Sequence, residues 1–415
     1  MTGANGVDRV RRTEAGSGGF RAAGERRSSG DCPPRNALAF LRMADHDVLR
    51  FATELSAKLA TRSRHVGAFL GAGAAQACGL PDVKRLEADV LDRLEEDDER
   101  VMRGLLQDRN LEQVLSRLRR IEALVSGQET VDALTADAAA ELDRRICSQI
   151  VAALDLGGAT LEPMRQFAAW AARTNYHWPI ELFSVNYDLL VETALEEIRA
   201  LYFDGFVGAL RARFQTDLVE QWPGDTQTAL PNAFVRLWKL HGSVNWAWTA
   251  GSEIVRLGSA VTTGQAAAIY PSDAKYEESR RVPFVVLQDR FRRALHQPET
   301  LMLISGYSFS DDHLNELLFD AATRRERSEL IAFCFSAIPT VLAERAERTP
   351  NLQAVSPAEG IIGGVRAPWA KPQDSAPGIW EGDAFVLNDF ARLANYLARS
   401  TDPEPGFATA PIAPV

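Results

Sequence analysis

Residues 66–81 read VGAFLGAGAAQACGLP, and this stretch decides the fold. An apolar run ends directly in Gly71-Ala72-Gly73, and small residues follow as far as Gly79. A strand that leads through such a turn into a helix is typical of Rossmann-type α/β proteins, because backbone amides and the helix N-terminus can face phosphate groups. The third glycine of the GxGxxG pattern is absent, since Gln76 occupies its place. The turn therefore predicts a phosphate-binding loop, with a packing role for the glycines as the alternative.

Strand-like and helical patterns alternate on both sides of this loop. Apolar residues recur at helical spacing over residues 48–59, and a strand-like run covers 65–70. Further strand-like runs cover residues 180–184, 235–240, 266–270, 300–305 and 330–335. Residues 83 to about 175 are instead rich in Leu, Arg and Glu at helical spacing. We expect an α/β fold, a Rossmann-like parallel sheet covered by helices, with a large helical insertion or subdomain.

The ends of the chain differ in composition from this central part. We expect a disordered leader over residues 1–42, with the true start at Met1 or Met43, because Arg, Gly and Ser dominate there. The Rossmann domain is expected over 43–345 and a C-terminal segment over 346–400. Residues 354–379 of that segment are crowded with Gly and Pro, and 384–400 has the pattern of a final amphipathic helix. A Pro-rich, disordered tail is expected over 401–415.

Composition excludes several classes of protein. The 415 residues carry a formal net charge of -10, which argues against a surface built for generic nucleic-acid binding. No apolar run reaches the roughly 18 to 20 residues of a membrane span. Residues 1–42 contain no continuous apolar stretch, so we expect no secretory signal. The four cysteines are isolated, without the CxxC spacing of a zinc site. We expect a folded cytoplasmic protein without a metal site.

Three further stretches, the second, third and fourth after residues 66–81, place polar residues at the ends of expected strands. FSVNYDLLVETAL (183–195) delivers Asn186 and Asp188 to the sheet edge where α/β proteins bind ligands, although both residue types also cap helices. LWKLHGSVNW (237–246) places His241 before a tight turn that would leave the imidazole accessible for proton transfer, although a lone histidine is often structural.

The fourth stretch is TLMLISGYSFSDDHLNELL (300–318). Gly306 permits close approach of a ligand, and Ser308 can bond a phosphate or a ribose. Asp311 or Asp312 is expected to cap the helix that follows.

In chain order, the GAGA, N-x-D, HGS and GYS motifs resemble the sirtuin family over residues 66–335, in particular its zinc-free bacterial branch in antiphage defence proteins. The resemblance implies that Asn186 and Asp188 flank the nicotinamide ribose of NAD and that His241 is the catalytic base. It implies that the 71–75 turn cradles the phosphates and that 306–308 hold the adenosine half. The residues assigned to binding NAD are Gly71, Ala72, Gly73, Ala74, Gly242, Gly306, Tyr307 and Ser308.

The resemblance also implies an activity. Deacetylase sirtuins hold a structural zinc in two CxxC pairs, and this chain has none, so no zinc is expected and protein deacylation is disfavoured. The remaining chemistry is hydrolysis of NAD, through an oxocarbenium-like transition state, to nicotinamide and ADP-ribose. In this interpretation Asn186 orients the water, Asp188 helps to bind nicotinamide and His241 assists proton transfer.

The expected role is that of an NAD glycohydrolase that depletes NAD on phage infection. The resemblance implies a homo-oligomer with a HerA-like DNA-translocating ATPase as partner, favoured over an Argonaute-type protein because no nucleic-acid module is appended. The alternatives are an NAD-dependent deacylase or ADP-ribosyltransferase, and a non-catalytic NAD-binding module. A Rossmann dehydrogenase is weakened by the missing GxGxxG spacing.

Overall fold

The computed structural model describes most of the chain between residues 45 and 399. The described ranges are 45–107, 109–127, 129–173, 176–220, 234–249, 253–261, 267–269, 282–324 and 327–399. The expected leader (1–42), the alternative start Met43 and the expected tail (401–415) lie outside the described residues. All described elements belong to one compact unit, Ala44–Val415.

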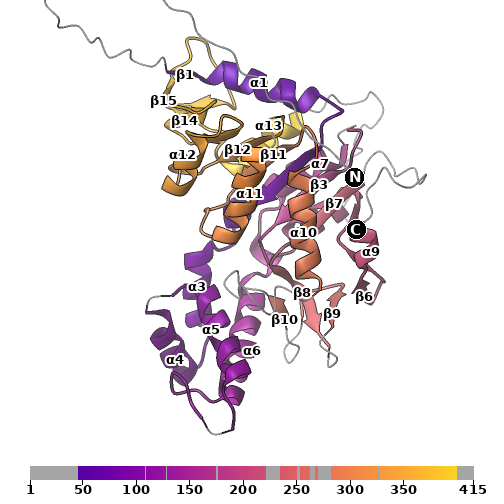
Figure 1. Cartoon of the computed structure of the whole chain (residues 1–415), viewed down its shortest axis with the longest axis vertical. Helices are drawn as coiled ribbons and strands as arrows, with labels where there is room; N and C mark the ends of the chain where they lie inside the picture. Colours follow the sequence, from indigo (N-terminus) through magenta and orange to yellow (C-terminus); the bar gives the residue numbers. More distant parts are fainter. Residues whose placement is uncertain are drawn as a thin grey trace, which may run out of the picture. The chain divides into compact units, whose positions relative to one another are not determined.

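A mostly parallel sheet forms the centre of this unit (Figure 1). Within the described residues it has ten strands, in the spatial order β1 (His46–Asp47), β15 (Val365–Ala370), β14 (Glu359–Ile362), β13 (Leu352–Val355), β12 (Glu329–Phe333), β11 (Leu301–Ser305), β2 (Val66–Leu70), β3 (Ile180–Ser184), β7 (Phe234–Lys239) and β4 (Leu201–Phe203). The strands from β13 to β4 in this order are parallel to one another. The α/β class predicted from the sequence is confirmed.

The strand order locates the ligand-binding edge. Counted along the chain from β2, the order β7-β3-β2-β11-β12-β13 is the 3-2-1-4-5-6 arrangement of dinucleotide-binding folds. The direction of winding reverses between β2 and β11, and ligands of such sheets bind beyond the carboxyl ends of the strands at this reversal. The four motifs of the sequence follow β2, β3, β7 and β11, so they meet at this edge.

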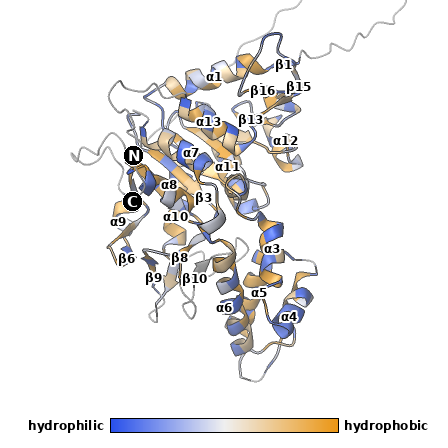
Figure 2. Cartoon of the chain, turned by 180° about the vertical axis from the view of Figure 1, so that it is seen from behind, coloured by the Kyte–Doolittle hydropathy of each residue, from blue (hydrophilic) through white to orange (hydrophobic). Residues whose placement is uncertain are grey.

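Side-chain alternation explains why these short runs form a covered sheet. In β2, Val66, Ala68 and Leu70 join the core on one face, whereas Phe69 joins the core on the other. Every residue of β2, β3 and β11 is buried, as expected for parallel strands with helices on both faces. Figure 2 shows these strands as largely hydrophobic ribbons between helices with polar outer faces.

Two groups of helices cover the sheet. One core contains the buried side chains of α1 (Val48–Ala60), α7 (Glu162–Arg173), α8 (Leu190–Glu197) and α13 (Phe390–Arg399). The other contains those of α10 (Phe284–Leu295), α11 (Asp312–Arg324) and α12 (Thr340–Ala346). The helices predicted over 48–59 and within 384–400 are thus present as α1 and α13.

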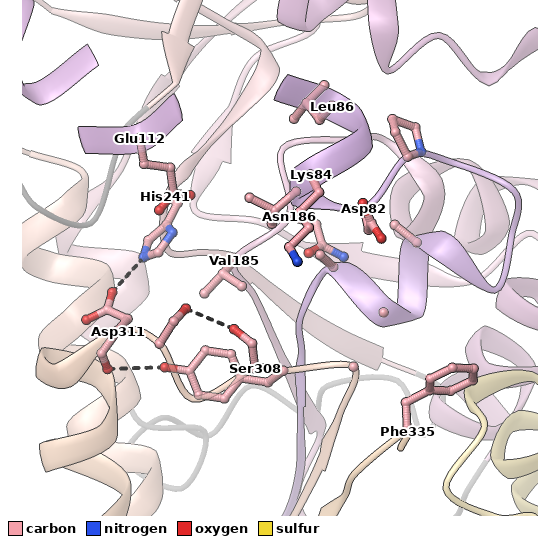
Figure 3. Close-up of a pocket in the computed structure, with 18 of the residues that line it drawn as sticks. Asp82, Lys84, Leu86, Glu112, Val185, Asn186, His241, Ser308, Asp311 and Phe335 are labelled. Atoms are coloured by element: carbon pink, nitrogen blue, oxygen red, sulfur yellow. Dashed lines mark hydrogen bonds and ion pairs between the residues drawn. The ribbon is translucent and has the colours of Figure 1, made fainter. Parts of the chain in front are cut away.

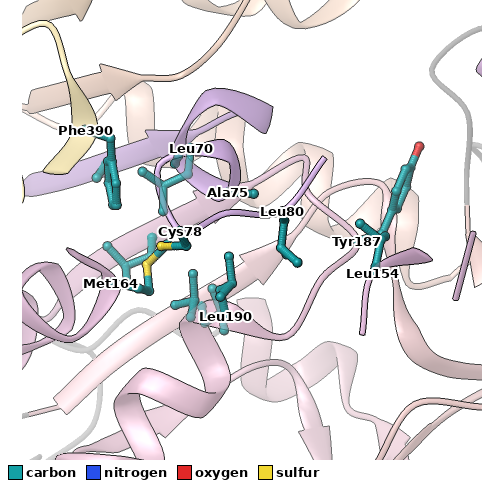
Figure 4. Packing of buried hydrophobic residues seen from close by; sticks show 14 of the residues in the cluster. Leu70, Ala75, Cys78, Leu80, Leu154, Met164, Tyr187, Leu190 and Phe390 are labelled. Carbon is teal, nitrogen blue, oxygen red and sulfur yellow. The ribbon is translucent and has the colours of Figure 1, made fainter. Parts of the chain in front are cut away.

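The glycine-rich turn is packed into the first of these cores. The short helix α2 (Ala72–Gln76) follows β2 at once, and Cys78 and Leu80 continue from it into the apolar interior. Figure 4 shows Cys78 among Leu70, Met164 and Phe390, which come from β2, α7 and α13. The small residues after Gly73 therefore let the chain turn within a closely packed space.

The helical insertion is shorter than the sequence predicts. The helices α3 (Val83–Leu91), α4 (Glu96–Leu106), α5 (Leu111–Leu124) and α6 (Ala136–Ala153) contact one another and form a subdomain beside the carboxyl edge of the sheet (Figure 1). After the short η1 (Leu156–Gly158), α7 packs on α8 and α13 instead. Residues 162–173 were predicted within the insertion, but they cover the sheet because Met164, Phe167 and Trp170 are buried there.

A second sheet was not anticipated from the sequence. Its strands are antiparallel and have the order β10 (Ala267–Ile269), β8 (Gly242–Trp248), β9 (Ile254–Leu257), β6 (Arg211–Phe214) and β5 (Phe206–Val207), with α9 (Thr216–Glu220) nearby in sequence. The run predicted at 266–270 is a strand, but it pairs with β8 in this sheet and not in the parallel one. The sequence thus predicted one of the five described strands of this sheet, and it predicted neither the other four strands nor how they pair.

The domain boundary predicted at residue 345 does not mark the end of the central sheet. β13, β14 and β15 lie beyond it and extend the central sheet, and the last two fall within the stretch that is crowded with Gly and Pro. The pair β16 (Trp380–Glu381) and β17 (Ala384–Phe385) follows before α13. In the described part of the chain no helix is both long enough and apolar enough to cross a membrane.

Candidate active site

A cavity of about 580 Å³ opens at the carboxyl edge of the sheet, over the reversal point (Figure 3). Its size falls within the roughly 300 to 1,000 Å³ of small-molecule sites. Gly71, Ala74 and Gly242, which the sequence also assigned to the site, do not line it. The predicted residues that do line it are Ala72, Gly73, Asn186, Asp188, His241, Gly306, Tyr307 and Ser308.

The glycines of the first motif pack against the fourth motif. The Gly73 amide donates to the Gly306 carbonyl at 2.9 Å, and a Cβ on Gly71 would lie 2.5 Å from that same oxygen. Gly306 has φ +68°, and a Cβ there would lie 2.3 Å from the Ala74 nitrogen. These distances are too short for any side chain, so the glycines let two neighbouring strand-end loops touch. The glycines therefore have the packing role that the sequence analysis gave as the alternative. Gly73 and Gly306 also line the cavity.

The remaining residues of the fourth motif are held by local hydrogen bonds. The Tyr307 hydroxyl donates to Asn315 Oδ1 at 3.1 Å, and its ring meets Phe69 edge-on with 4.8 Å between the ring centres. Ser308 Oγ lies 2.9 Å from Ser310 Oγ. The loop is thus rigid at the tyrosine, while both serine hydroxyls stay at the cavity wall.

Asn186 is tied to the glycine loop. Its Nδ2 donates to the Gly71 carbonyl at 3.0 Å, and its backbone amide donates to Ser184 Oγ. Because the amide nitrogen faces Gly71, the side-chain carbonyl oxygen is the atom suited to accept a hydrogen bond from a water or a hydroxyl. Asn186 therefore joins the second motif to the first.

Asp188 accepts a hydrogen bond at a helix start and also lies on the cavity. Its Oδ1 accepts a hydrogen bond from the Leu190 amide at 3.0 Å, at the start of α8, and the residue also lines the cavity. The Asp188 carbonyl accepts from Lys239 Nζ, which is buried and paired with Glu192 at 3.3 Å. The lysine at the end of β7 thus anchors the loop that carries Asn186 and Asp188.

His241 lies between β7 and β8, where Gly242 with φ +87° turns the chain. The expectation of an accessible imidazole needs correction, because only 7% of the residue is exposed. The turn leads straight into β8, and the following residues are buried in the second sheet. The imidazole reaches the cavity wall from within the protein and not from a surface turn.

Asp311 is the partner of His241, a pairing that the sequence did not reveal. His241 Nε2 lies 3.5 Å from Asp311 Oδ2, while Asp311 Oδ1 accepts from the His313 and Leu314 amides at the start of α11. The predicted helix cap is therefore present and is also the histidine's neighbour. Burial raises the pKa of Asp311, but the hydrogen bond and charge of His241 and the two amides outweigh it, so the pKa is lowered overall.

An ionised Asp311 determines how the histidine can work. A carboxylate beside Nε2 favours the tautomer that carries its proton on that nitrogen. The other ring nitrogen is then free to accept a proton. A carboxylate in this position can orient an imidazole for general-base chemistry, and Asn186 and Asp188 lie on the same cavity.

The helical subdomain contributes residues that sequence reasoning missed. Asp82, Lys84 and Glu112 line the cavity from the first turns of α3 and α5 or just before them. Glu112 Oε1 accepts a hydrogen bond from the Tyr187 hydroxyl at 2.9 Å. Tyr187 lies between Asn186 and Asp188 in the sequence. This position was the only feature of the sequence that could have pointed to Tyr187 as a site residue. Its partner, 75 residues earlier in the chain, could not be inferred from spacing.

The described cysteines do not gather. Cys78, Cys147 and Cys334 are free and buried, and Cys32 lies outside the described residues. Burial raises the pKa of the Cys334 thiol, which lines the cavity, to about 12. Among the residues that the structure describes, no group of three or more His, Cys, Asp or Glu side chains could hold a metal ion.

Comparison with protein families matches residues 180–354 to the SIR2-like domain. The match runs from β3 to β13 and includes Asn186, Asp188, His241 and the 306–308 loop. A search of curated proteins found no match. A SIR2-like domain indicates NAD-related activity, and the strand order and the cavity at its reversal agree with a dinucleotide ligand. Residues 180–354 of the chain therefore match a SIR2-like domain, and the chain has a Rossmann-type α/β fold.

Proposed function

We propose that the chain is an NAD glycohydrolase that cleaves the bond between nicotinamide and ribose, giving nicotinamide and ADP-ribose. The observation that carries the proposal is the His241–Asp311 pair on the same cavity as Asn186 and Asp188. A general base, a carboxamide oxygen and carboxylates at one end of a dinucleotide-sized cavity suit attack by water on an electron-poor sugar carbon.

Each residue has a defined part in this reaction. As the glycosidic bond breaks, its electron pair leaves with nicotinamide and positive charge develops on the ribose. Asp188 and Asp311 supply negative charge beside the reacting sugar, which lowers the energy of that cation. The Asn186 side-chain oxygen orients a water, whose oxygen bonds to the sugar carbon. His241 accepts the proton that the water loses.

The first experiment is chromatography of NAD incubated with the purified full chain. We expect release of nicotinamide and ADP-ribose, and a loss of about 10²- to 10⁴-fold in rate for His241→Ala and Asn186→Ala. His177→Ala is the matched control, because His177 is exposed and precedes β3, at the end of the strand opposite Asn186. Intact NAD despite measurable NAD binding would sink the hydrolase and favour a non-catalytic NAD-binding module.

Product identity separates the other enzyme classes. An acylated peptide added with NAD would yield acyl-ADP-ribose if the chain were a deacylase, and a labelled protein if it were an ADP-ribosyltransferase. The hydrolase proposal expects free ADP-ribose in the same yield with and without the peptide. A requirement for the peptide would contradict it.

We further propose that the activity serves defence against phage by depleting NAD, in a homo-oligomer with a HerA-like ATPase as partner and an Argonaute-type protein as the alternative. This role rests on the resemblance of the four motifs to the defence branch of sirtuins. The test measures cellular NAD after phage infection of bacteria that express the chain alone or with a co-encoded partner. NAD that stays constant in infected cells with both proteins would remove the proposed role.

A further inference from the structure

Phe335 is a large apolar side chain left open to solvent on the cavity wall. It is 62% exposed, and it is the only phenylalanine among the described residues that belongs to the exposed class. It lies two residues after the end of β12 and lines the same cavity as His241. In Figure 3 the Phe335 ring lies on the side of the cavity away from His241 and Asp311.

The backbone that carries this ring is held firmly. The Cys334 amide donates to the Val355 carbonyl at 2.8 Å. The Phe335 carbonyl accepts a hydrogen bond from Asn388 Nδ2, also at 2.8 Å. Asn388 lies just before α13 and is only 7% exposed. The exposed ring is therefore presented by a fixed loop, clamped from the C-terminal segment.

The order of strands shows how far the Phe335 loop lies from the loops that carry His241 and Asn186. Along the carboxyl edge, the loops follow one another as His241 after β7, Asn186 after β3, Gly73 after β2, Gly306 after β11 and Phe335 after β12. At roughly 4.8 Å per strand, the β7 and β12 loops are about 19 Å apart along the sheet. A dinucleotide whose reacting ribose lies at His241 and Asn186 would place its other base near β12.

We propose that Phe335 stacks on the adenine base of NAD and that Asn388 is the residue that positions it. The inference rests on the proposed function for the orientation of the dinucleotide. An aromatic ring offers the flat apolar surface that a base covers, and the covered ring then leaves water. The fixed backbone means that little freedom of the loop is lost when the base binds.

The test compares NAD with nicotinamide mononucleotide, which has the reacting bond but no adenylate. For Phe335→Ala we expect KM for NAD to rise about 5- to 140-fold with kcat unchanged, and cleavage of the mononucleotide to stay as in the wild type. Phe335→Tyr should retain the wild-type KM, because it keeps an aromatic face. Leu210→Ala is the matched control, since Leu210 is 86% exposed and lies outside the cavity lining.

Two kinetic outcomes would overturn the inference. Equal losses on NAD and on the mononucleotide would mean that Phe335 supports the fold of the site, and an unchanged KM for NAD would place adenine elsewhere. Asn388→Ala should raise KM for NAD by a smaller factor and add nothing in the Phe335→Ala background. Additive effects would show that Asn388 does not act through Phe335.

A binding measurement separates this inference from the proposed function. If no variant cleaves either nucleotide, calorimetry with ADP-ribose replaces kinetics. Weaker binding to Phe335→Ala and wild-type binding to Phe335→Tyr would keep the adenine site while the hydrolase fails. Equal binding to all three proteins would overturn the adenine site itself.

Discussion

The Asp311 carboxylate both caps helix α11 and faces the His241 imidazole. One oxygen of Asp311 accepts the amides that begin α11, and the other faces the imidazole. Asn can cap a helix as Asp does, but its amide cannot hold the imidazolium that forms when the base accepts a proton. For Asp311→Asn we therefore expect a folded protein whose kcat for NAD falls by about 10²-fold or more. Asp312→Asn, an exposed neighbour, is the control, and equal activity of the two variants would contradict the pairing.

The lowered pKa of Asp311 also predicts a pH dependence of stability. A carboxyl group with a lower pKa in the folded state stabilises that state above its unfolded pKa, and the contribution disappears as pH falls through the folded value. The difference in unfolding free energy between wild type and Asp311→Asn should be present at about pH 5 and shrink below about pH 4. Urea unfolding across this range measures it. A difference that grows toward acid pH would reverse the sign assigned here.

A hydrogen bond joins the helical subdomain to the loop that carries Asn186 and Asp188. Tyr187 is held at its backbone carbonyl by the Val244 amide at 2.9 Å and at its hydroxyl by Glu112 of α5. Asn110 caps α5 with a full capping box, so the first turn that carries Glu112 is itself well fixed. We infer that α5 positions the segment that contains Asn186 and Asp188.

Removal of this bond tests the coupling between subdomain and loop. Tyr187→Phe loses the donor, whereas Glu112→Gln keeps an acceptor, so kcat should fall roughly 10-fold or more in the first and little in the second. A hydrogen bond to a charged group contributes about 1.5–3 kcal/mol, which limits the loss to about 150-fold. The double variant should be no slower than Tyr187→Phe. Losses that multiply would mean that the two residues act separately.

The whole described unit depends on its C-terminal part. Phe390, Leu393 and Leu397 of α13 are at most 3% exposed, and β13 continues the sheet beside β12. Each of these side chains contributes roughly 1.5–3 kcal/mol by burial, so together they match the net stability of a typical domain.

A truncation tests this dependence. A chain that ends at residue 345, the boundary predicted from composition, should lose cooperative thermal unfolding, because the core under α13 would be open to water. A chain that begins at Met43 is the control and should unfold as the full chain does, since every described element follows that residue. A cooperative transition in the 1–345 chain would contradict the assignment of α13 and β13 to the same core.

Some residues of the site could be predicted from local sequence patterns, whereas others became visible only through their tertiary contacts. The motifs that end β2, β3, β7 and β11 were visible as apolar runs followed by Gly, Asn, Asp or His, so the strand ends and eight cavity-lining residues were predicted. Asp311 was recognised only as a cap. Glu112, Lys239 and Phe335 carried no signal, because a charged or aromatic residue beside a helix or strand is ordinary until its neighbour is known.

The sequence alone determined the α/β class, the Rossmann-type turn and the strand ends, because burial patterns and turn residues act within a few positions of one another. The structure decided the second sheet, the strands beyond residue 345, the limits of the helical subdomain and the partners of His241 and Tyr187. Those features join residues up to hundreds of positions apart. They depend on which surfaces pack together in the folded chain, and local periodicity carries no record of that choice.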